Sequence, residues 1–310
     1  MIACSGVIDR AAAQQACPDE TIYVAMLGTR KHRLSGENPV VGVFYTNDFG
    51  QTWQHTGWKQ GKAFATFVPE TSCGDTMWVA AGNGVMRSTD AGKSWRITTG
   101  WEVTEVQDVW VPTHDPTEVW AATPYGIYRS SDFGHSWNHH DTAFASSVRG
   151  GFIGTEQGLQ DSYGSRAIEK PVRSIRSSPF DPEVWLVALE EGGIRVSHDG
   201  AQSFLPDATG GRTIYEAEFH PEDPAMIYAG GWDTGLLLSD DLGASWSEVE
   251  AFPARNVHGI AISRRNPSVI VVGSMDDGVF VTKNAGSTWE AAAPDIFEAG
   301  QIWDVHIPGE

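Results

Sequence analysis

Ser130-Ser131-Asp132-Phe133-Gly134-His135-Ser136-Trp137 is the stretch that decides the fold, because its pattern occurs six times in the chain. The pattern is Ser/Thr-x-Asp/Asn-x-Gly-x-Ser/Thr-Trp. Along the chain, the third positions of successive copies are 42, 42, 67, 42 and 43 residues apart. A repeat of about 40–45 residues made of short strands is typical of a β-propeller. The third positions of the six copies are Asp48, Asp90, Asp132, Asp199, Asp241 and Asn284.

Each copy has the chemistry of a tight turn between two strands. The acidic or amide side chain can accept hydrogen bonds from backbone N–H groups just beyond it, and the glycine allows a positive φ. The final Trp is expected to pack between neighbouring sheets. We therefore predict a structural role for the six Asp and Asn residues. The copy at 197–204 has Ala201 and Phe204 in place of Gly and Trp, so its hairpin is predicted to be the least regular.

These residues resemble the Asp-box, or BNR, repeat, and the resemblance covers nearly the whole chain. The repeat occurs in sialidases, sortilin-type receptors, xyloglucan-type endoglucanases and photosystem-assembly propellers, so the resemblance implies a fold and leaves the function open. A sialidase also carries an Arg-Ile-Pro motif and an arginine triad. The chain contains no Arg-Ile-Pro, so the resemblance does not extend to a true sialidase.

We expect an all-β chain in which residues 1–310 form a single β-propeller, with a short N-terminal segment at 1–20. Each repeat has four strands, A to D from the channel outward, with the Asp box at the C–D turn. The first repeat lacks its A strand, and Ile302–Pro308 has the matching pattern. The C-terminal strand is thus predicted to close the ring in blade one.

The repeat spacing predicts six blades. The long interval between the third and fourth copies is then an inserted loop at 144–171, rich in Gly and Ser, between blades three and four. Seven blades is the alternative, and it requires strands within Ile2–Arg10.

Composition restricts the partners and the compartment. The formal charge of −19 argues against nucleic acid, whose binding relies on clustered Lys and Arg. No apolar run is long enough to span a membrane. Only 6 of the 21 basic residues are Lys, which fits either a salt-rich environment or an ordinary acidic protein.

The odd number of cysteines, Cys4, Cys17 and Cys73, favours reduced thiols and a cytoplasmic location. No signal-peptide pattern is present. An exported chain whose leader has been removed would look the same, so export is the alternative.

The aligned A strands predict a ring of side chains at the channel mouth, on the face formed by the D–A and B–C connections. Three carboxylates and a histidine in this ring suit acid–base catalysis or cation binding. The other interpretation is that each side chain bonds to a neighbouring strand. No cofactor or metal is predicted, and a cation in the channel is the alternative. The ring consists of Phe64, Asp108, Ser174, Glu216, His258 and Asp304.

Further ligand-binding candidates lie on the same face. Arg30, Lys31, His32 and Arg33 form the densest basic cluster and suit an anionic ligand. Arg173 and Tyr215 precede two ring positions. Four Trp residues outside the expected core can stack on a sugar or contact a protein, and these are Trp58, Trp101, Trp232 and Trp303.

Two functions follow from these candidates. The leading hypothesis is a non-catalytic propeller that binds a ligand or protein partner on its loop-bearing face. The alternative is a glycoside hydrolase or lyase acting on carbohydrate, with carboxylates among Asp108, Glu216 and Asp304. The partner is accordingly predicted to be a carbohydrate or a protein.

Overall fold

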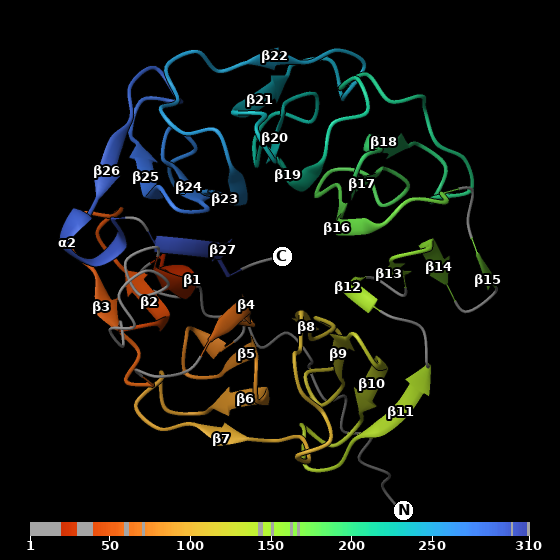
Figure 1. Ribbon diagram of the computed structural model, residues 1–310, viewed down its shortest axis with the longest axis vertical. Helices are drawn as coiled ribbons and strands as arrows, with labels where there is room; N and C mark the ends of the chain where they lie inside the picture. The colour runs from red at the N-terminus through yellow and green to blue at the C-terminus, as the bar shows by residue number, and fades with distance from the viewer. Residues whose placement is uncertain are drawn as a thin grey trace, which may run out of the picture.

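The protein is a ring of seven antiparallel sheets around a central channel (Figure 1). The structure, a computed structural model, describes residues 20–29, 40–58, 62–69, 72–141, 145–149, 152–161, 164–165, 168–298 and 300–308. Each sheet is one blade, and its inner strand faces the channel.

The first four blades each have four strands. From the channel outward, blade one is β27 (Gly300–His306), β1 (Ile22–Thr29), β2 (Gly42–Thr46) and β3 (Gln54–His55). Blade two is β4 (Ala63–Phe67), β5 (Met77–Ala81), β6 (Gly84–Ser88) and β7 (Arg96–Ile97). Blade three is β8 (Asp108–Trp110), β9 (Val119–Thr123), β10 (Gly126–Ser130) and β11 (Asn138–Asp141). Blade four is β12 (Ala145–Arg149), β13 (Phe152–Thr155), β14 (Gly158–Asp161) and β15 (Gly164–Ser165).

The remaining blades follow in chain order. Blade five is β16 (Val172–Ser177), β17 (Trp185–Leu189) and β18 (Gly193–Ser197). Blade six is β19 (Ile214–Phe219), β20 (Ile227–Gly231), β21 (Leu236–Ser239) and β22 (Ser247–Glu248). Blade seven is β23 (Val257–Ile262), β24 (Ile270–Ser274), β25 (Gly278–Thr282) and β26 (Glu290–Ala292), followed by the short helix α2 (Pro294–Phe297).

The blade count corrects the leading prediction of six and matches the alternative of seven. The segment expected as an inserted loop at 144–171 contains blade four, β12–β15. Its strands are very short and it has no Asp box, so its repeat is much more compact than the others. Buried Val148, Phe152 and Leu159 anchor it, because these apolar side chains fill the spaces against the neighbouring blades.

The C-terminal strand closes the ring as predicted. β27 pairs with β1 in antiparallel register, with Val24 opposite Val305 and Tyr23 opposite His306. Blade one therefore joins the two ends of the described chain in one sheet. Closure of this kind leaves no inner strand unpaired between the first and last blades.

The Asp boxes show a shared hydrogen-bond pattern. In blade three, Asp132 accepts bonds from the Ser136 N–H at 2.8 Å and the Ser136 hydroxyl at 2.6 Å, and from the Ser130 hydroxyl at 2.8 Å. These bonds, with the Ser136 hydroxyl first, lower the pKa of Asp132 to about 2. The side chain thus fastens the C–D turn, which follows the β10 strand.

Blade five is the one blade with three strands among the described residues, and it carries the degenerate Asp box. Leu205 donates its N–H to the Val196 carbonyl, but Pro206 follows directly and has no N–H for a ladder. The Asp207 carboxylate accepts the Ile194 N–H instead, at 3.1 Å. The hairpin predicted to be least regular is therefore the one without a fourth strand.

The glycine of the Asp box in blade three lies against blade two, which makes it sensitive to substitution. Gly134 has φ +76°, and a methyl group there would lie 2.9 Å from the Trp78 ring. We expect Gly134→Ala to lower the free energy of unfolding by about 2–4 kcal/mol, from the left-handed backbone and from overpacking. Gly286→Ala is the matched control, because it has φ +84° but its nearest neighbour is 3.7 Å away, so it should cost only about 1–2 kcal/mol. Equal losses in urea unfolding would contradict the packing argument.

The channel as candidate functional site

The predicted ring positions meet around one cavity in the channel. Its volume is about 120 Å³, and residues of all seven inner strands line it. A water molecule occupies about 30 Å³ in the liquid, so the cavity has room for a few waters or one small chemical group. The lining includes every ring residue that the aligned A strands predicted, namely Phe64, Asp108, Ser174, Glu216, His258 and Asp304.

Two of the three ring carboxylates bind the backbone of the next blade. Asp304 in blade one accepts the N–H of Thr66 in blade two at 2.7 Å. Asp108 in blade three accepts the N–H of Val148 in blade four at 3.0 Å. Each carboxylate therefore joins two inner strands that share no sheet.

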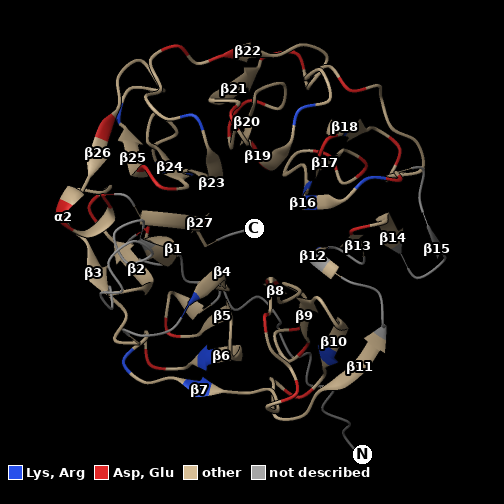
Figure 2. Cartoon of the chain, in the orientation of Figure 1, with Lys and Arg blue, Asp and Glu red and all other residues tan. Residues whose placement is uncertain are grey.

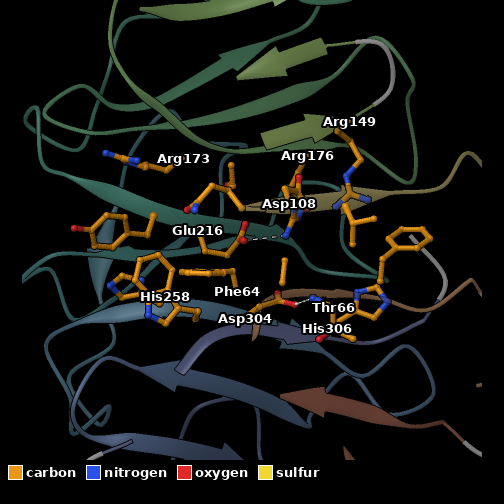
Figure 3. Close-up of a pocket in the computed structure, with 17 residues that line it drawn as sticks. Phe64, Thr66, Asp108, Arg149, Arg173, Arg176, Glu216, His258, Asp304 and His306 are labelled. Atoms are coloured by element: carbon orange, nitrogen blue, oxygen red, sulfur yellow. Dashed lines mark hydrogen bonds and ion pairs between the residues drawn. The ribbon is translucent and has the colours of Figure 1, made fainter. Parts of the chain in front are cut away.

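The third ring carboxylate, Glu216, forms a buried ion pair between blades. The Arg176 guanidinium on β16 contacts Glu216 at 2.9 Å and Glu218 at 3.2 Å, both on β19. Glu216 also accepts the N–H of Ala217 at 2.9 Å. Figure 3 shows Arg176 and Glu216 joined across the cavity, and Asp304 joined to Thr66 on its other side.

The channel environment shifts the pKa values of two ring residues in opposite directions. Burial raises the pKa of Asp304 to about 7, and the negative charges of Glu216 and Asp108 add to this, while the Thr66 N–H and Arg176 oppose it. Asp304 keeps partial contact with the channel lumen, but that lumen is enclosed by protein and does not solvate a charge as bulk water does. Burial lowers the pKa of His258 to about 4, helped by the positive charge of Arg173.

The Asp304 shift predicts a pH-dependent effect of its replacement. The folded protein holds this proton up to about pH 7, whereas the ordinary pKa of an Asp carboxyl is 3.8. The resulting stabilisation is complete below about pH 4 and is lost as the pH rises through 7. Asp304→Asn keeps an oxygen for the Thr66 N–H and loses the ionisation. Three pKa units correspond to about 4 kcal/mol, which contact with channel water reduces, so we expect the variant to gain about 1–2 kcal/mol over the wild type between pH 5 and pH 8.

Thermal and urea unfolding of both proteins across this pH range measure the gain. His258 is common to both, so the difference between their profiles reports Asp304 alone. Parallel profiles from pH 5 to pH 8 would show that Asp304 is ionised throughout and would overturn the assignment.

Aromatic side chains line one side of the cavity. Tyr215 and His258 stack with ring centroids 4.1 Å apart, Trp303 lies 5.2 Å from His258, and Phe64 meets Trp303 edge-on at 5.5 Å. Among the described residues, His258 Nε2, Trp303 Nε1 and the Thr66 hydroxyl are buried and have no hydrogen-bond partner. Buried polar atoms are costly without partners, so this wall has hydrogen-bonding capacity that the described part of the protein does not use.

Arginines line the opposite side. Arg149, Arg173 and Arg176 lie across the cavity from His258 and Asp304 (Figure 3). Arg173 pairs with Glu190 and, at 3.3 Å, with Glu156. Figure 2 shows the basic residues of β16 beside the channel, in a ring whose outer connections carry many acidic residues. One side of the channel is therefore lined by arginines, of which Arg173 and Arg176 are paired with carboxylates.

The remaining predicted Trp residues differ in exposure. Trp101 is 90% exposed and Trp232 is 55% exposed, and both lie in connections of the loop-bearing face. Tyr125, which is 51% exposed in the β9–β10 connection of the same face, was not predicted. Trp58 instead packs near Trp95, with ring centroids 6.5 Å apart.

Four further predictions concern the basic cluster, a metal site, membrane-spanning helices and the cysteines. The basic cluster Arg30, Lys31, His32 and Arg33 lies outside the described residues. In the part of the chain that the structure describes, no group of three or more His, Cys, Asp or Glu is arranged to hold a metal ion, and no helix is long and apolar enough to cross a membrane. Cys73 is disulfide-bonded, which corrects the expectation that it is a reduced thiol.

Comparisons with known proteins support the fold. The family model described as BNR/Asp-box repeat matches residues 44–55, and a search of curated proteins gives no significant match. The structure of YCF48 from Cyanidioschyzon merolae is 18% identical with a TM-score of 0.56, covering 83% of this chain and 89% of that one. The structure of YCF48 bound to D1 peptide is 16% identical with a TM-score of 0.52, covering 82% and 91%. The chain is thus a BNR-type β-propeller.

Enzymes described as GH74 are also similar to this chain, with lower TM-scores. The enzyme from Niastella koreensis is 14% identical with a TM-score of 0.48, and the match covers 90% of this chain and 45% of that one. An ancestral GH74 enzyme is 18% identical with a TM-score of 0.43, covering 74% and 31%. The chain therefore spans less than half the length of these enzymes, and the likeness concerns the propeller fold alone.

Proposed function

We propose that this propeller is a non-catalytic binding protein that holds a peptide or protein partner on its loop-bearing face. A carboxylate of the partner enters the channel cavity, between the arginines and the aromatic wall. The observation that carries the proposal is the hydrogen bonding of the cavity. Its own carboxylates bind neighbouring strands or Arg176, whereas His258 Nε2, Trp303 Nε1 and the Thr66 hydroxyl have no partner among the described residues.

These unused groups favour an acceptor ligand. The Trp303 indole can only donate a hydrogen bond, and the hydroxyl of Thr66 can donate as well. The cavity, with a volume of about 120 Å³, has room for one small group such as a carboxylate. Charge-assisted hydrogen bonds are about twice as strong as neutral ones, so a carboxylate gains the most from this site.

The exposed aromatic residues favour a macromolecular partner. Trp101, Tyr125 and Trp232 are exposed and lie in connections of the loop-bearing face. Large aromatic side chains supply much of the binding energy in protein interfaces. YCF48, which has a similar fold, has been observed with a bound D1 peptide, and this agrees with a peptide as the occupant.

Glycoside hydrolysis is the second candidate, because one observation favours it. Asp304 has a pKa raised to about 7, as expected of a general acid, and lies near Glu216 and Asp108. A glycosidase needs a second carboxylate that is free to act as base or nucleophile. Glu216 is paired with Arg176 and Asp108 binds the Val148 N–H, which makes this candidate weaker.

Binding of matched peptides tests the proposal. We expect acetyl-Ala-Asp-Ala-amide to bind, as followed by ligand-detected NMR, and acetyl-Ala-Asn-Ala-amide to bind at least about tenfold more weakly. Trp303→Phe keeps the ring beside Phe64 and His258 and removes the N–H, so it should abolish the preference for the Asp peptide. Equal binding of the two peptides to the wild type would refute a carboxylate site.

The disulfide supports a proposal about location. Structural disulfides are rare in the cytoplasm, so the bond at Cys73 favours the exported alternative over the cytoplasmic location first expected. With three cysteines in the chain, one free thiol per chain is expected when the unfolded, unreduced protein is titrated with a thiol reagent. Three free thiols in freshly purified protein would contradict the bond and would favour the cytoplasm.

A further inference from the structure

A second, larger cavity lies at the other mouth of the channel. Its volume is about 420 Å³. Ser177 and Phe219, at the ends of β16 and β19, line it, as do Ile262 at the end of β23 and Ile307 just after β27. Inner strands end at the A–B turns, which share a face with the Asp boxes because the strands of each blade alternate in direction. This cavity therefore opens on the face opposite the proposed partner site.

The size and lining are those of a small-molecule site. Pockets that bind small ligands usually enclose about 300–1,000 Å³, with apolar walls and a few polar groups. Phe219, Ile262 and Ile307 are buried side chains of this lining, and Pro179, Pro221 and Ala261 complete its apolar part. The first cavity is much smaller, so an apolar ligand of several carbons fits only the second.

The polar lining is mainly cationic. Arg149, Arg176 and Arg264 line this cavity together with a single acidic residue, Glu218. Arg176 is already paired with Glu216 and Glu218. The Arg264 side chain is exposed, and no ion pair joins it to another described residue. A site with this excess of positive charge is unusual in a chain whose formal charge is −19.

Neutral donors add to the arginines. The Ser178 hydroxyl oxygen accepts the N–H groups of Phe180 at 3.2 Å and Asp181 at 3.4 Å, so its own proton remains available for a ligand acceptor. Ser177 lines the same cavity. Hydroxyl and guanidinium donors beside apolar walls match a ligand with an anionic head and an apolar body.

We propose that the Asp-box-side mouth of the channel binds an organic anion that carries an apolar group beside a carboxylate or phosphate. Arg264 and Arg149 contact the head, and the apolar body lies against Phe219, Ile262 and Ile307. The site differs from the partner site, because it opens on the opposite face and uses Arg264, which does not line the first cavity, whereas Arg149 and Arg176 line both.

Titration with a matched ligand series tests the proposal. Hexanoate, hexyl phosphate, hexylammonium and hexanol share one apolar chain and differ in the head. We expect calorimetry at fixed ionic strength to show binding of hexanoate or hexyl phosphate, with the stronger of the two identifying the preferred head. Hexanol and hexylammonium should bind at least about tenfold more weakly. Equal binding of hexanol and both anions, or no binding of either anion, would overturn the proposal.

Neighbouring arginines provide the control. Arg264→Gln should raise the dissociation constant of the preferred anion about tenfold. Arg265→Gln, on the same turn but outside the lining, should change it less than about twofold. Both side chains are exposed, so we expect both variants to fold, as checked by thermal unfolding. Equal effects of the two variants would reject the site. Hexanoate also carries the carboxylate that the partner site is proposed to bind, so the titration in Trp303→Phe reports the second site. This variant should keep the Arg264-dependent binding of hexanoate while losing the Asp-peptide preference, so the two proposals fail separately.

Discussion

Removal of Gly300–Glu310 should abolish cooperative folding of the propeller. This deletion takes away β27, the inner strand of blade one, and with it the buried side chains Ile302, Val305 and Ile307. Burying one such side chain contributes about 1.5–3 kcal/mol. Three of them sum to roughly 5–9 kcal/mol, which is comparable to the total stability of a typical domain.

The deletion also breaks the contact between blades one and two. Asp304 and His306 on β27 accept the N–H groups of Thr66 and Val68 in blade two. We therefore expect the truncated protein to lose its near-ultraviolet circular dichroism and its sharp thermal transition. Deletion of only Gly309 and Glu310 is the control and should leave both unchanged. A cooperative transition within a few degrees of wild type for the longer deletion would show that β27 does not hold the ring closed.

Replacement of Arg176 by Leu should destabilise the protein by about 3–5 kcal/mol. The Arg176 side chain is only 15% exposed, and its partners Glu216 and Glu218 are 9% and 14% exposed. Removing one partner of a buried ion pair leaves uncompensated charge in the interior, which is the costly change. The measurement is the free energy of unfolding in urea at pH 7.

An exposed arginine that also contacts two carboxylates is the control. Arg255 is 51% exposed and contacts Asp233, which is 74% exposed, and Glu248, which is 45% exposed. Arg255→Leu should cost about 1 kcal/mol or less, because surface pairs contribute little. Similar losses of unfolding free energy for the two variants would mean that the channel ion pair does not hold blades five and six together. Glu216 could then not be regarded as occupied by a structural role.

The sequence predicted the inner ring well, because the repeat preserves the register of each blade. Once the Asp boxes were aligned, residues as far apart as Phe64 and Asp304 were expected at one channel mouth, and they line one cavity. Alternation along a strand brings every second side chain to the same face. Arg176 and Glu218, two residues after Ser174 and Glu216, were accessible by the same reasoning.

Blade four could not be predicted from the sequence in this way. Residues 145–165 have no Asp box or Pro-containing turn, and strands of two to five residues leave too little alternation to recognise. Arg149 on β12 was missed with its blade. Both interpretations of the ring carboxylates were open at the sequence level. The sequence could not decide between them, because the partners of Asp304 and Asp108 are the backbone N–H groups of Thr66 and Val148, which carry no sequence signal.

We propose that this propeller binds a carboxylate group in its channel and does not catalyse glycoside hydrolysis there. The most direct measurement combines thermal unfolding with assay of reducing-sugar release, in the same samples, for acetate, xyloglucan oligosaccharides and sialyllactose. We predict that acetate, compared with chloride at equal ionic strength, raises the melting temperature of the wild type and not of Trp303→Phe, and that no sugar is released. The contrary result is that the wild type releases sugar and the folded Asp304→Asn variant does not. That result would establish the channel as an active site.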